Sequence, residues 1–166
     1  MMSLAKKLTP KIASEAHYEM ATEKDVVELT YLFKDFFEES DYADKGIAYS
    51  PNNAAVWLRR VITQGVFPHV VARIDGKIVG VTSFSLDQSF SEEPIAVLHT
   101  IYVRPEFRRT QIGRQLLALA LFVAEGDGAT CFSAPISSGM KEVPSLQNMF
   151  RKAGFRQSGA ILTKGF

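Results

Sequence analysis

The sequence lacks the features that define several large classes of protein. Its 166 residues include one cysteine, Cys131, which excludes an internal disulfide and a zinc site built from cysteines. No apolar stretch approaches the roughly 20 residues that span a bilayer, and the N-terminus has no continuous apolar core of the kind found in signal peptides. We therefore expect a soluble protein of a reducing compartment, cytoplasmic and with no membrane partner.

A surplus of one charge is also lacking. The chain has 19 Lys and Arg against 18 Asp and Glu, a formal net charge of +1. Binding of nucleic acid through its phosphates needs a basic surplus, so we expect no nucleic-acid partner. His17 and His69 have no Cys, Asp or Glu at ligand spacing, which predicts that the chain holds no metal. Any function that needs positive charge must therefore depend on a local cluster of basic residues.

The apolar residues that are present suffice for one core. Hydrophobic residues make up 46% of the chain, and this length fits a single domain. We expect an N-terminal arm over residues 1–14 and one domain over residues 15–166.

Two amphipathic helices are predicted in the first third of the chain. Thr22 is an N-cap with Asp25 three residues later, and apolar residues then recur at helical spacing as far as Phe37. Ser50 and Pro51 supply the cap and first residue of a second helix, which ends before Gly65. Both predicted helices carry their apolar residues on one face.

The later sequence alternates strand and helix patterns. Asp75-Gly76 is a hairpin signal between two runs rich in β-branched and aromatic residues. The remaining predictions, in order, are a strand "IAVLHTIYV", a helix from Ile112, a strand "ATCFSAPI", a helix "SLQNMFRKAGF" and a strand pair around Phe155 and at 161–164. The predicted fold class is α/β (mixed α+β), a mixed, mostly antiparallel sheet flanked by helices.

The stretch "VRPEFRRTQIGRQLL", residues 103–117, is a turn from a strand into a helix. Backbone N–H groups at a helix N-terminus have no intrahelical partner, and the helix dipole adds positive charge, so this junction predicts an anion site. Arg108 and Arg109 add charge, and Gly113 lets the backbone approach a ligand closely. The alternative is that these arginines are only solvated.

The order of a strand, Val-x-Pro, an Arg-rich turn and a Leu-rich helix resembles the acyl-CoA-binding signature of the GNAT superfamily of N-acyltransferases. The family motif is Gln or Arg, two variable residues, Gly, one variable residue, then Gly or Ala. Here "RRTQIG" supplies Arg108 and Gly113, while Gln111 stands where the first glycine is expected. The resemblance implies a GNAT-like sheet with a splay between Leu98–Val103 and Thr130–Ala134.

By this resemblance the chain is an acetyl-CoA-dependent N-acetyltransferase, with acetyl-CoA or another acyl-CoA as co-substrate. Transfer to an amine would occur by direct attack in a ternary complex. Pyrophosphate would bind the backbone of the turn, which the Gln111 side chain leaves available if its dihedrals are helical. The implied cofactor-binding residues are Ile101, Val103, Arg108, Arg109, Thr110, Gln111, Ile112, Gly113 and Arg114.

Removal of a proton from the amine points to His99 as a general base, because its unperturbed pKa lies near neutrality. Strand parity places His99 on the face of Ile101 and Val103. The alternative is a core histidine bonded to a backbone carbonyl. Family members often carry a tyrosine acid where this chain has Phe150. Protonation of the departing thiolate would then fall to water or Ser145, or the chain binds acyl-CoA without efficient turnover.

The acceptor site implied by the family lies beside the first two helices. Glu38, Glu39 and Tyr42 in their connection predict an acidic rim that favours a cationic acceptor, a small-molecule amine or a protein amine. A merely solvated loop is the alternative. A Phe-rich first helix leaves a homodimer open. Cys131 is expected to be buried as a small hydrophobe.

Two other functions remain open at this point. A catalytically weak or inactive sensor or interaction module that binds CoA or acyl-CoA would also explain Gln111 and Phe150. The third alternative is a phosphate-binding regulatory domain unrelated to CoA.

Overall fold

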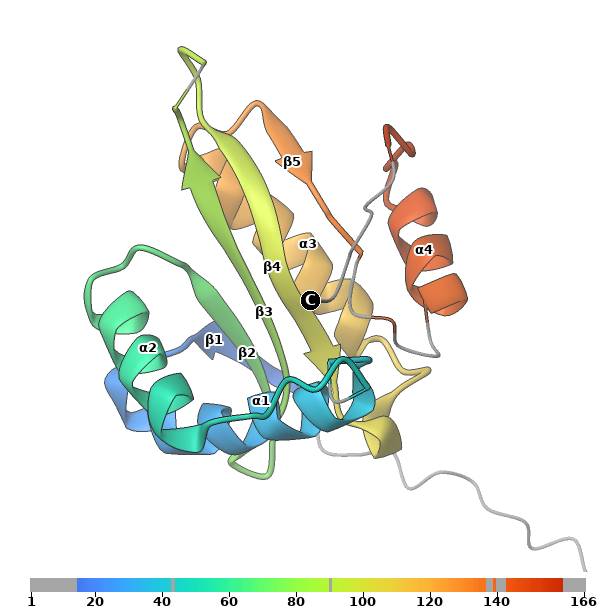
Figure 1. The fold of residues 1–166 in the computed structure, drawn as a ribbon. Helices are drawn as coiled ribbons and strands as arrows, with labels where there is room; N and C mark the ends of the chain where they lie inside the picture. Colours follow the sequence, from blue (N-terminus) through green and yellow to red (C-terminus); the bar gives the residue numbers. More distant parts are fainter. Residues whose placement is uncertain (1–14, 43, 90, 137–138, 140–142, 160–166) are drawn as a thin grey trace, which may run out of the picture.

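A computed structural model describes residues 15–159 except 43, 90, 137–138 and 140–142. The expected arm at 1–14 lies outside this part. One sheet of five strands in the order β1-β2-β3-β4-β5 forms the centre of the molecule (Figure 1). Its strands are β1 (His17–Met20), β2 (His69–Ile74), β3 (Lys77–Asp87), β4 (Ile95–Val103) and β5 (Cys131–Ser133).

The sheet is mostly antiparallel, as predicted. The pairs β1/β2, β2/β3 and β3/β4 are antiparallel, and β4 and β5 are parallel. Helices α1 (Val26–Glu39) and α2 (Pro51–Thr63) cover one face, and α3 (Ile112–Gly126) packs on the other (Figure 1). The last described helix is α4 (Val143–Lys152). Within the described residues, no helix has the length and apolarity to cross a membrane.

Local signals set the helix starts where the sequence predicts them. Thr22 and Asp25 form a capping box around a short 3-10 helix (Glu23–Asp25) that leads into α1. The Ser50 hydroxyl accepts from the Asn53 N–H at 3.3 Å, with proline as the next residue. The predicted starts of α1 and α2 are confirmed.

The hairpin between β2 and β3 turns at Asp75-Gly76. Both residues have positive φ, 50° and 77°. Positive φ at both central residues is the geometry of the turn that matches strand twist, and glycine adopts it without steric cost. The predicted hairpin is confirmed.

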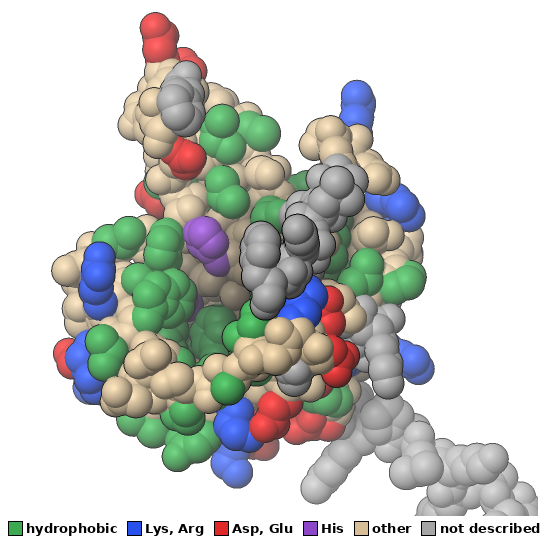
Figure 2. Space-filling model, in the orientation of Figure 1, with side chains coloured by type: hydrophobic (Ala, Val, Ile, Leu, Met, Phe, Trp, Pro, Cys, Tyr) green, Lys and Arg blue, Asp and Glu red, His purple; other side chains and the backbone are tan. Residues whose placement is uncertain are grey.

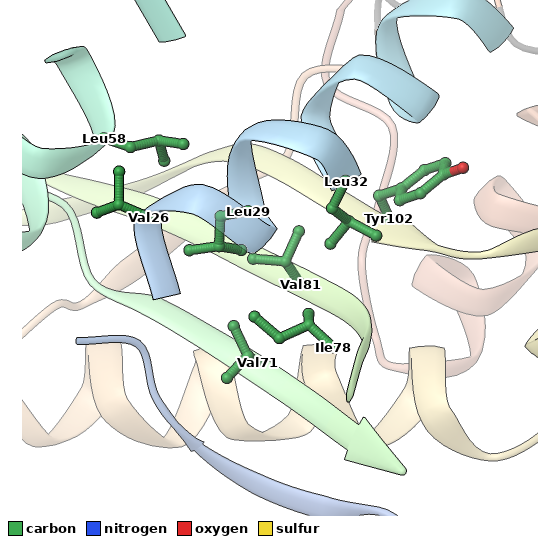
Figure 3. Close-up of a cluster of buried hydrophobic side chains, with 8 residues drawn as sticks. All are labelled: Val26, Leu29, Leu32, Leu58, Val71, Ile78, Val81 and Tyr102. Atoms are coloured by element: carbon green, nitrogen blue, oxygen red, sulfur yellow. The ribbon is translucent and has the colours of Figure 1, made fainter. Parts of the chain in front are cut away.

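The larger apolar cluster lies between the sheet and the α1–α2 pair (Figure 3). Leu29 and Leu32 of α1 are fully buried against Val71 of β2 and Val81 of β3. Burying such a side chain stabilises the fold by about 1.5–3 kcal/mol. On the opposite face, α3 contributes Ile112 and Leu116 to a second cluster.

Ionic contacts join the start of α1 to the hairpin. The Glu28 carboxylate accepts from the Ile78 N–H at 2.6 Å. The Arg73 guanidinium donates to Asp25 and to Glu19, the latter at 2.5 Å, and forms an ion pair with Glu28 at 3.4 Å. Asp25 is 8% exposed. The carboxylates therefore orient α1 on the sheet while the apolar cluster supplies the burial energy.

Three expectations differ from the structure. Residues 155–159 form no strand, so the strand predicted around Phe155 is wrong, and 161–164 lies outside the described residues. The strand predicted as "ATCFSAPI" is limited to Cys131–Ser133. Cys131 is exposed, not buried, because in this short strand at the sheet edge it is Phe132 that packs into the core.

Asp25 makes the stability of the fold dependent on pH. Burial alone would raise its pKa, but hydrogen bonds from Thr22 and Arg73 lower it below the ordinary 3.8. Its contribution is thus present above pH 3.8 and is lost as pH falls through the lowered folded value. Asp25→Ala should cost about 1–3 kcal/mol of unfolding free energy at pH 7 and less at pH 3, measured by urea denaturation. Glu92→Ala, at an exposed position, is the control; an equal cost at both pH values would contradict the prediction.

Candidate functional site

The junction between β4 and α3 presents free backbone donors. The first intrahelical bond of α3 runs from the Gln115 N–H to the Gln111 carbonyl, at 2.9 Å. Gln111 has φ −75° and ψ −13°, which is helical, so its side chain does not turn the backbone donors away. Thr110 Oγ1 accepts from the Ile112 N–H at 3.3 Å. The N–H groups of Gly113 and Arg114 therefore remain for an anion.

The fold itself does not require a glycine at position 113. A Cβ built there would lie 3.5 Å from the Met149 sulfur and 3.8 Å from Val103 Cγ2, which are ordinary contacts. The protein itself thus has room for a small side chain at this position.

The Arg108 side chain binds other residues of the chain and stabilises the turn. Its Nε donates to the Val103 carbonyl at 2.8 Å, and its Nη2 donates to Glu39 at 2.6 Å. The guanidinium also lies over the Tyr102 ring, 5.3 Å from the centroid. These contacts hold the turn against the end of α1.

Glu39 joins three elements through its two oxygens. One accepts from Arg108, and the other accepts from the Tyr102 hydroxyl at 2.5 Å. Tyr102 belongs to the apolar cluster, with its hydroxyl pointing away from the other labelled side chains (Figure 3). Burial and the Glu39 carboxylate raise the pKa of Tyr102 far above its ordinary value. The phenol therefore stays protonated and serves as a donor.

Arg109 and Arg114 are the arginines of the turn that face solvent. Both are exposed, and within the described part of the chain neither forms an ion pair. Arg109 has a φ of 63°, a conformation that costs a residue with a Cβ about 1 kcal/mol or more. An exposed cation is thus held at a strained position beside the free N–H groups.

The predicted splay lies beside this turn. β5 pairs with β4 only from Ile95 to Val97, so the pairing ends before Leu98. The Arg104 N–H donates to the Val79 carbonyl of β3 at 2.9 Å. Because successive residues of a strand point their backbone groups to opposite sides, those of Ile101 and Val103 face the side from which β5 has departed.

A β-bulge changes the side on which His99 lies. Ser83 pairs with Thr100 and Phe84 pairs with Leu98, so His99 is the extra residue of β4. Ile101 and Val103 pack toward α3, whereas the His99 Nε2 lies 2.8 Å from Ser85 Oγ. The His99 ring also lies 4.7 Å from that of Phe67. His99 therefore does not share the face that uninterrupted parity predicts.

A second histidine, His69, lies beside His99 and was not predicted to belong to the site. It is 2% exposed, and its Nδ1 lies 2.7 Å from the Phe67 carbonyl, so Nδ1 carries the proton. Its Nε2 has no partner within the described residues, nor does the buried hydroxyl of Ser83, its cross-strand neighbour. Figure 2 shows histidine on this face next to hydrophobic side chains. The sequence offers no signal that His69 and His99 lie close together, because their proximity depends on the register of the strands.

Both imidazoles are neutral at pH 7. Burial lowers the pKa of His99 below 6.5. For His69, burial lowers the pKa most; its bond to the Phe67 carbonyl opposes this, and the nearby His99 lowers it further. Neutral imidazole is the form that accepts a proton. In the tautomer whose Nε2–H donates to Ser85, the lone pair of His99 Nδ1 is available.

Neither position on α4 that was considered as the acid, Phe150 or Ser145, places a hydroxyl group on the buried face of that helix. Phe150 is 4% exposed and packs with Leu98 and Leu117, and its ring lies 4.9 Å from that of Phe155. Ser145 is exposed in the first turns of α4.

The acidic loop is neutralised by the chain itself. Glu38 pairs with Lys34, and Asp41 pairs with Lys45 at 2.8 Å. Tyr42 stacks on Phe37 with 5.4 Å between ring centroids. Together with the Glu39 contacts, these pairs occupy most of the carboxylates, and among the described residues of the loop Asp44 is the acidic residue that is exposed and forms no ion pair. Within the described residues no cluster of His, Cys, Asp or Glu is suited to a metal ion.

Comparison with known proteins supports one assignment of this geometry. A model of the acetyltransferase (GNAT) family matches residues 26–155. No curated protein matches the chain.

Several solved structures share the fold. The aminoglycoside N-acetyltransferase AAC(6')-Iy in complex with CoA has a TM-score of 0.75 at 16% identity, covering 95% of this chain and 97% of that one. An aminoglycoside acetyltransferase from an uncultured soil metagenomic sample has 0.69 at 21% identity, covering 91% and 95%. A predicted acetyltransferase from Clostridium acetobutylicum, with acetyl-CoA, has 0.69 at 14%, covering 90% and 96%.

The Glu39 contacts predict energetic coupling. Glu39→Ala should cost about 1–3 kcal/mol of unfolding free energy, because the Arg108 guanidinium and the Tyr102 hydroxyl both lose this acceptor. Tyr102→Phe removes only the hydroxyl. In a double-mutant cycle measured by urea denaturation, the two costs should overlap by about 1 kcal/mol. Strict additivity would show that the hydroxyl and the carboxylate do not interact in solution.

Proposed function

The chain belongs to the acetyltransferase (GNAT) family, and from this premise we propose that it transfers an acetyl group from acetyl-CoA to an amine by direct attack in a ternary complex. The match over residues 26–155 carries the proposal. It includes the turn, the opening beside β4 and both histidines. Another acyl-CoA fits the same reasoning.

The chain's own groups suit a CoA-type ligand. The N–H groups of Gly113 and Arg114 donate to the oxygens of a pyrophosphate, and the Arg109 side chain adds a charge-assisted bond. The backbone of Ile101 and Val103 faces the opening, where the amides of a pantetheine arm find partners. One Val103 carbonyl lone pair already accepts from Arg108, which leaves its N–H and second lone pair.

His99 is the group suited to take the amine proton. In the proposed transfer the amine nitrogen attacks the thioester carbonyl carbon, the carbon–sulfur bond breaks, and the nitrogen gives up one proton. That proton passes to His99 Nδ1, directly or through a water. The departing CoA thiolate takes a proton either from water or from the hydroxyl of Ser145. The Phe150 side chain has no acidic proton to donate.

The second candidate is a CoA or acyl-CoA sensor without efficient turnover. The buried phenylalanine at 150 favours it, because the position lacks an acid. Turnover separates the two functions. We expect acetylated product, detected by mass spectrometry, when the protein is mixed with acetyl-CoA and a panel of amines. A thiol reagent is less suitable because Cys131 is exposed and would react. Tight CoA binding with no product from any amine would favour the sensor.

His99 should set the acid limb of the pH profile. Because burial lowers its pKa, the midpoint in kcat/KM should lie below 6.5, with activity rising as pH rises through it. His99→Gln should lower kcat/KM at pH 7 about 100-fold or more and remove this limb. His17→Gln, at an exposed residue of β1, is the control. An unchanged limb in His99→Gln would assign the proton transfer elsewhere.

Arg109 should serve binding at the expense of stability. Arg109→Gly relieves the positive φ, so the unfolding free energy should stay constant or rise by up to about 1 kcal/mol. The Kd for CoA, measured by calorimetry, should rise about tenfold because a charge-assisted contact is lost. Arg60→Ala removes an exposed arginine of α2 and should change neither value. Unchanged CoA affinity in Arg109→Gly would refute the assignment.

A further inference from the structure

A chain of aromatic rings leads from His99 to the surface of α2. Phe67 lies 4.7 Å from His99 and 5.8 Å from Trp57, between ring centroids. Trp57 is 40% exposed. Its other ring neighbour is His69, at 6.0 Å. On the face shown in Figure 2, a hollow next to a histidine is bordered by hydrophobic side chains.

The charges near this face do not suit a polycation. Recognition of several ammonium groups needs several free carboxylates. Along the second half of α1 and the start of its loop, Asp35, Glu38, Glu39 and Asp41 each bind a cation of the chain itself, namely Arg104, Lys34, Arg108 and Lys45. The two neighbouring imidazoles are neutral. Asp44, further along the loop, is exposed without an ion pair among the described residues, but a single free carboxylate does not match several ammonium groups. An occupant of this face would therefore find mainly rings and uncharged polar groups.

Beneath the rings lies an unsatisfied polar position. His69 Nε2 can only accept a hydrogen bond, and it and the Ser83 hydroxyl have no partner within the described residues although both side chains are buried. Buried polar atoms are nearly always paired, so two unpaired ones side by side mark a place for water or a ligand group. The aromatic wall thus stands next to an incomplete hydrogen-bond site.

We propose that the acceptor is an arylalkylamine whose ring packs against Trp57 and Phe67 while its amine lies at His99. This rests on the proposed function, which it makes specific. Aromatic rings gain from edge-to-face and offset contacts beyond the area they bury, and the tilted pair of Trp57 and Phe67 offers both faces and edges. Because the Phe67 and His99 rings lie 4.7 Å apart, a short alkyl link would let the ring of the acceptor contact Phe67 while its amine lies at His99.

Trp57 reports on its own occupancy, because it is the only tryptophan of the chain. Phenethylamine added to the protein with saturating CoA should change the Trp57 emission in a saturable way, and spermidine should not. With acetyl-CoA, phenethylamine should be acetylated with a higher kcat/KM than spermidine or the aminoglycoside kanamycin.

Variants localise the effect. Trp57→Ala should raise KM for phenethylamine about tenfold with little change in kcat, because the ring lies away from the reacting atoms. Trp57→Phe should restore most of this loss. Val56→Ala, at an exposed neighbour in α2, should leave KM unchanged, and no variant should alter the Kd for CoA.

The outcomes separate the inference from the proposed function. Transfer to spermidine or kanamycin, with no emission change or transfer for phenethylamine, would overturn the inference and leave N-acetyl transfer standing. A saturable emission change with phenethylamine but no acetylation of any amine would support the binding and overturn the proposed transfer. An equal rise of KM for phenethylamine and butylamine in Trp57→Ala would also overturn it, since butylamine has no ring.

Discussion

The register of β4 is the constraint on which the site depends. One extra residue, His99, interrupts its pairing with β3, and pairing with β5 ends at Val97. The bulge sends His99 to the face shared with Phe67 and His69, while Ile101 continues toward α3. β4 thereby presents the backbone groups of Ile101 and Val103 to the opening beside β5, and the His99 imidazole to the face covered by α1 and α2. Without the bulge, the His99 side chain would lie on the same face of the sheet as the side chains of Ile101 and Val103.

The α1 carboxylates make this arrangement rigid. Arg104 and Arg108 come from the chain just after β4, and each binds a carboxylate of α1, Asp35 and Glu39 respectively. Charged bonds of this kind, partly shielded from water, are stronger than neutral ones and fix orientation. The cations closest to the strand thus hold the turn in place, whereas Arg109 stays exposed to solvent, where the proposed function gives it a role in binding pyrophosphate.

Features controlled by neighbouring residues could be predicted from the sequence. The caps at Thr22 and Ser50 and the Asp75-Gly76 turn are local, and they lie where expected. The partners of Arg108 and His99 could not be predicted. Glu39 is 69 residues from Arg108 in sequence, and a bulge depends on how two strands pair, which residue types do not encode. Parity therefore failed at His99, although the strand itself was predicted correctly.

Cys131 has a consequence of a different kind. It is the chain's only thiol and is exposed at the start of β5, while the only indole belongs to α2 and contacts β2. In the sheet order, β3 and β4 lie between these two positions. A dye coupled to the thiol would therefore pair with the indole for energy transfer across the sheet. The wild-type chain therefore already carries both groups needed to measure, by energy transfer, movements of β5 relative to α2.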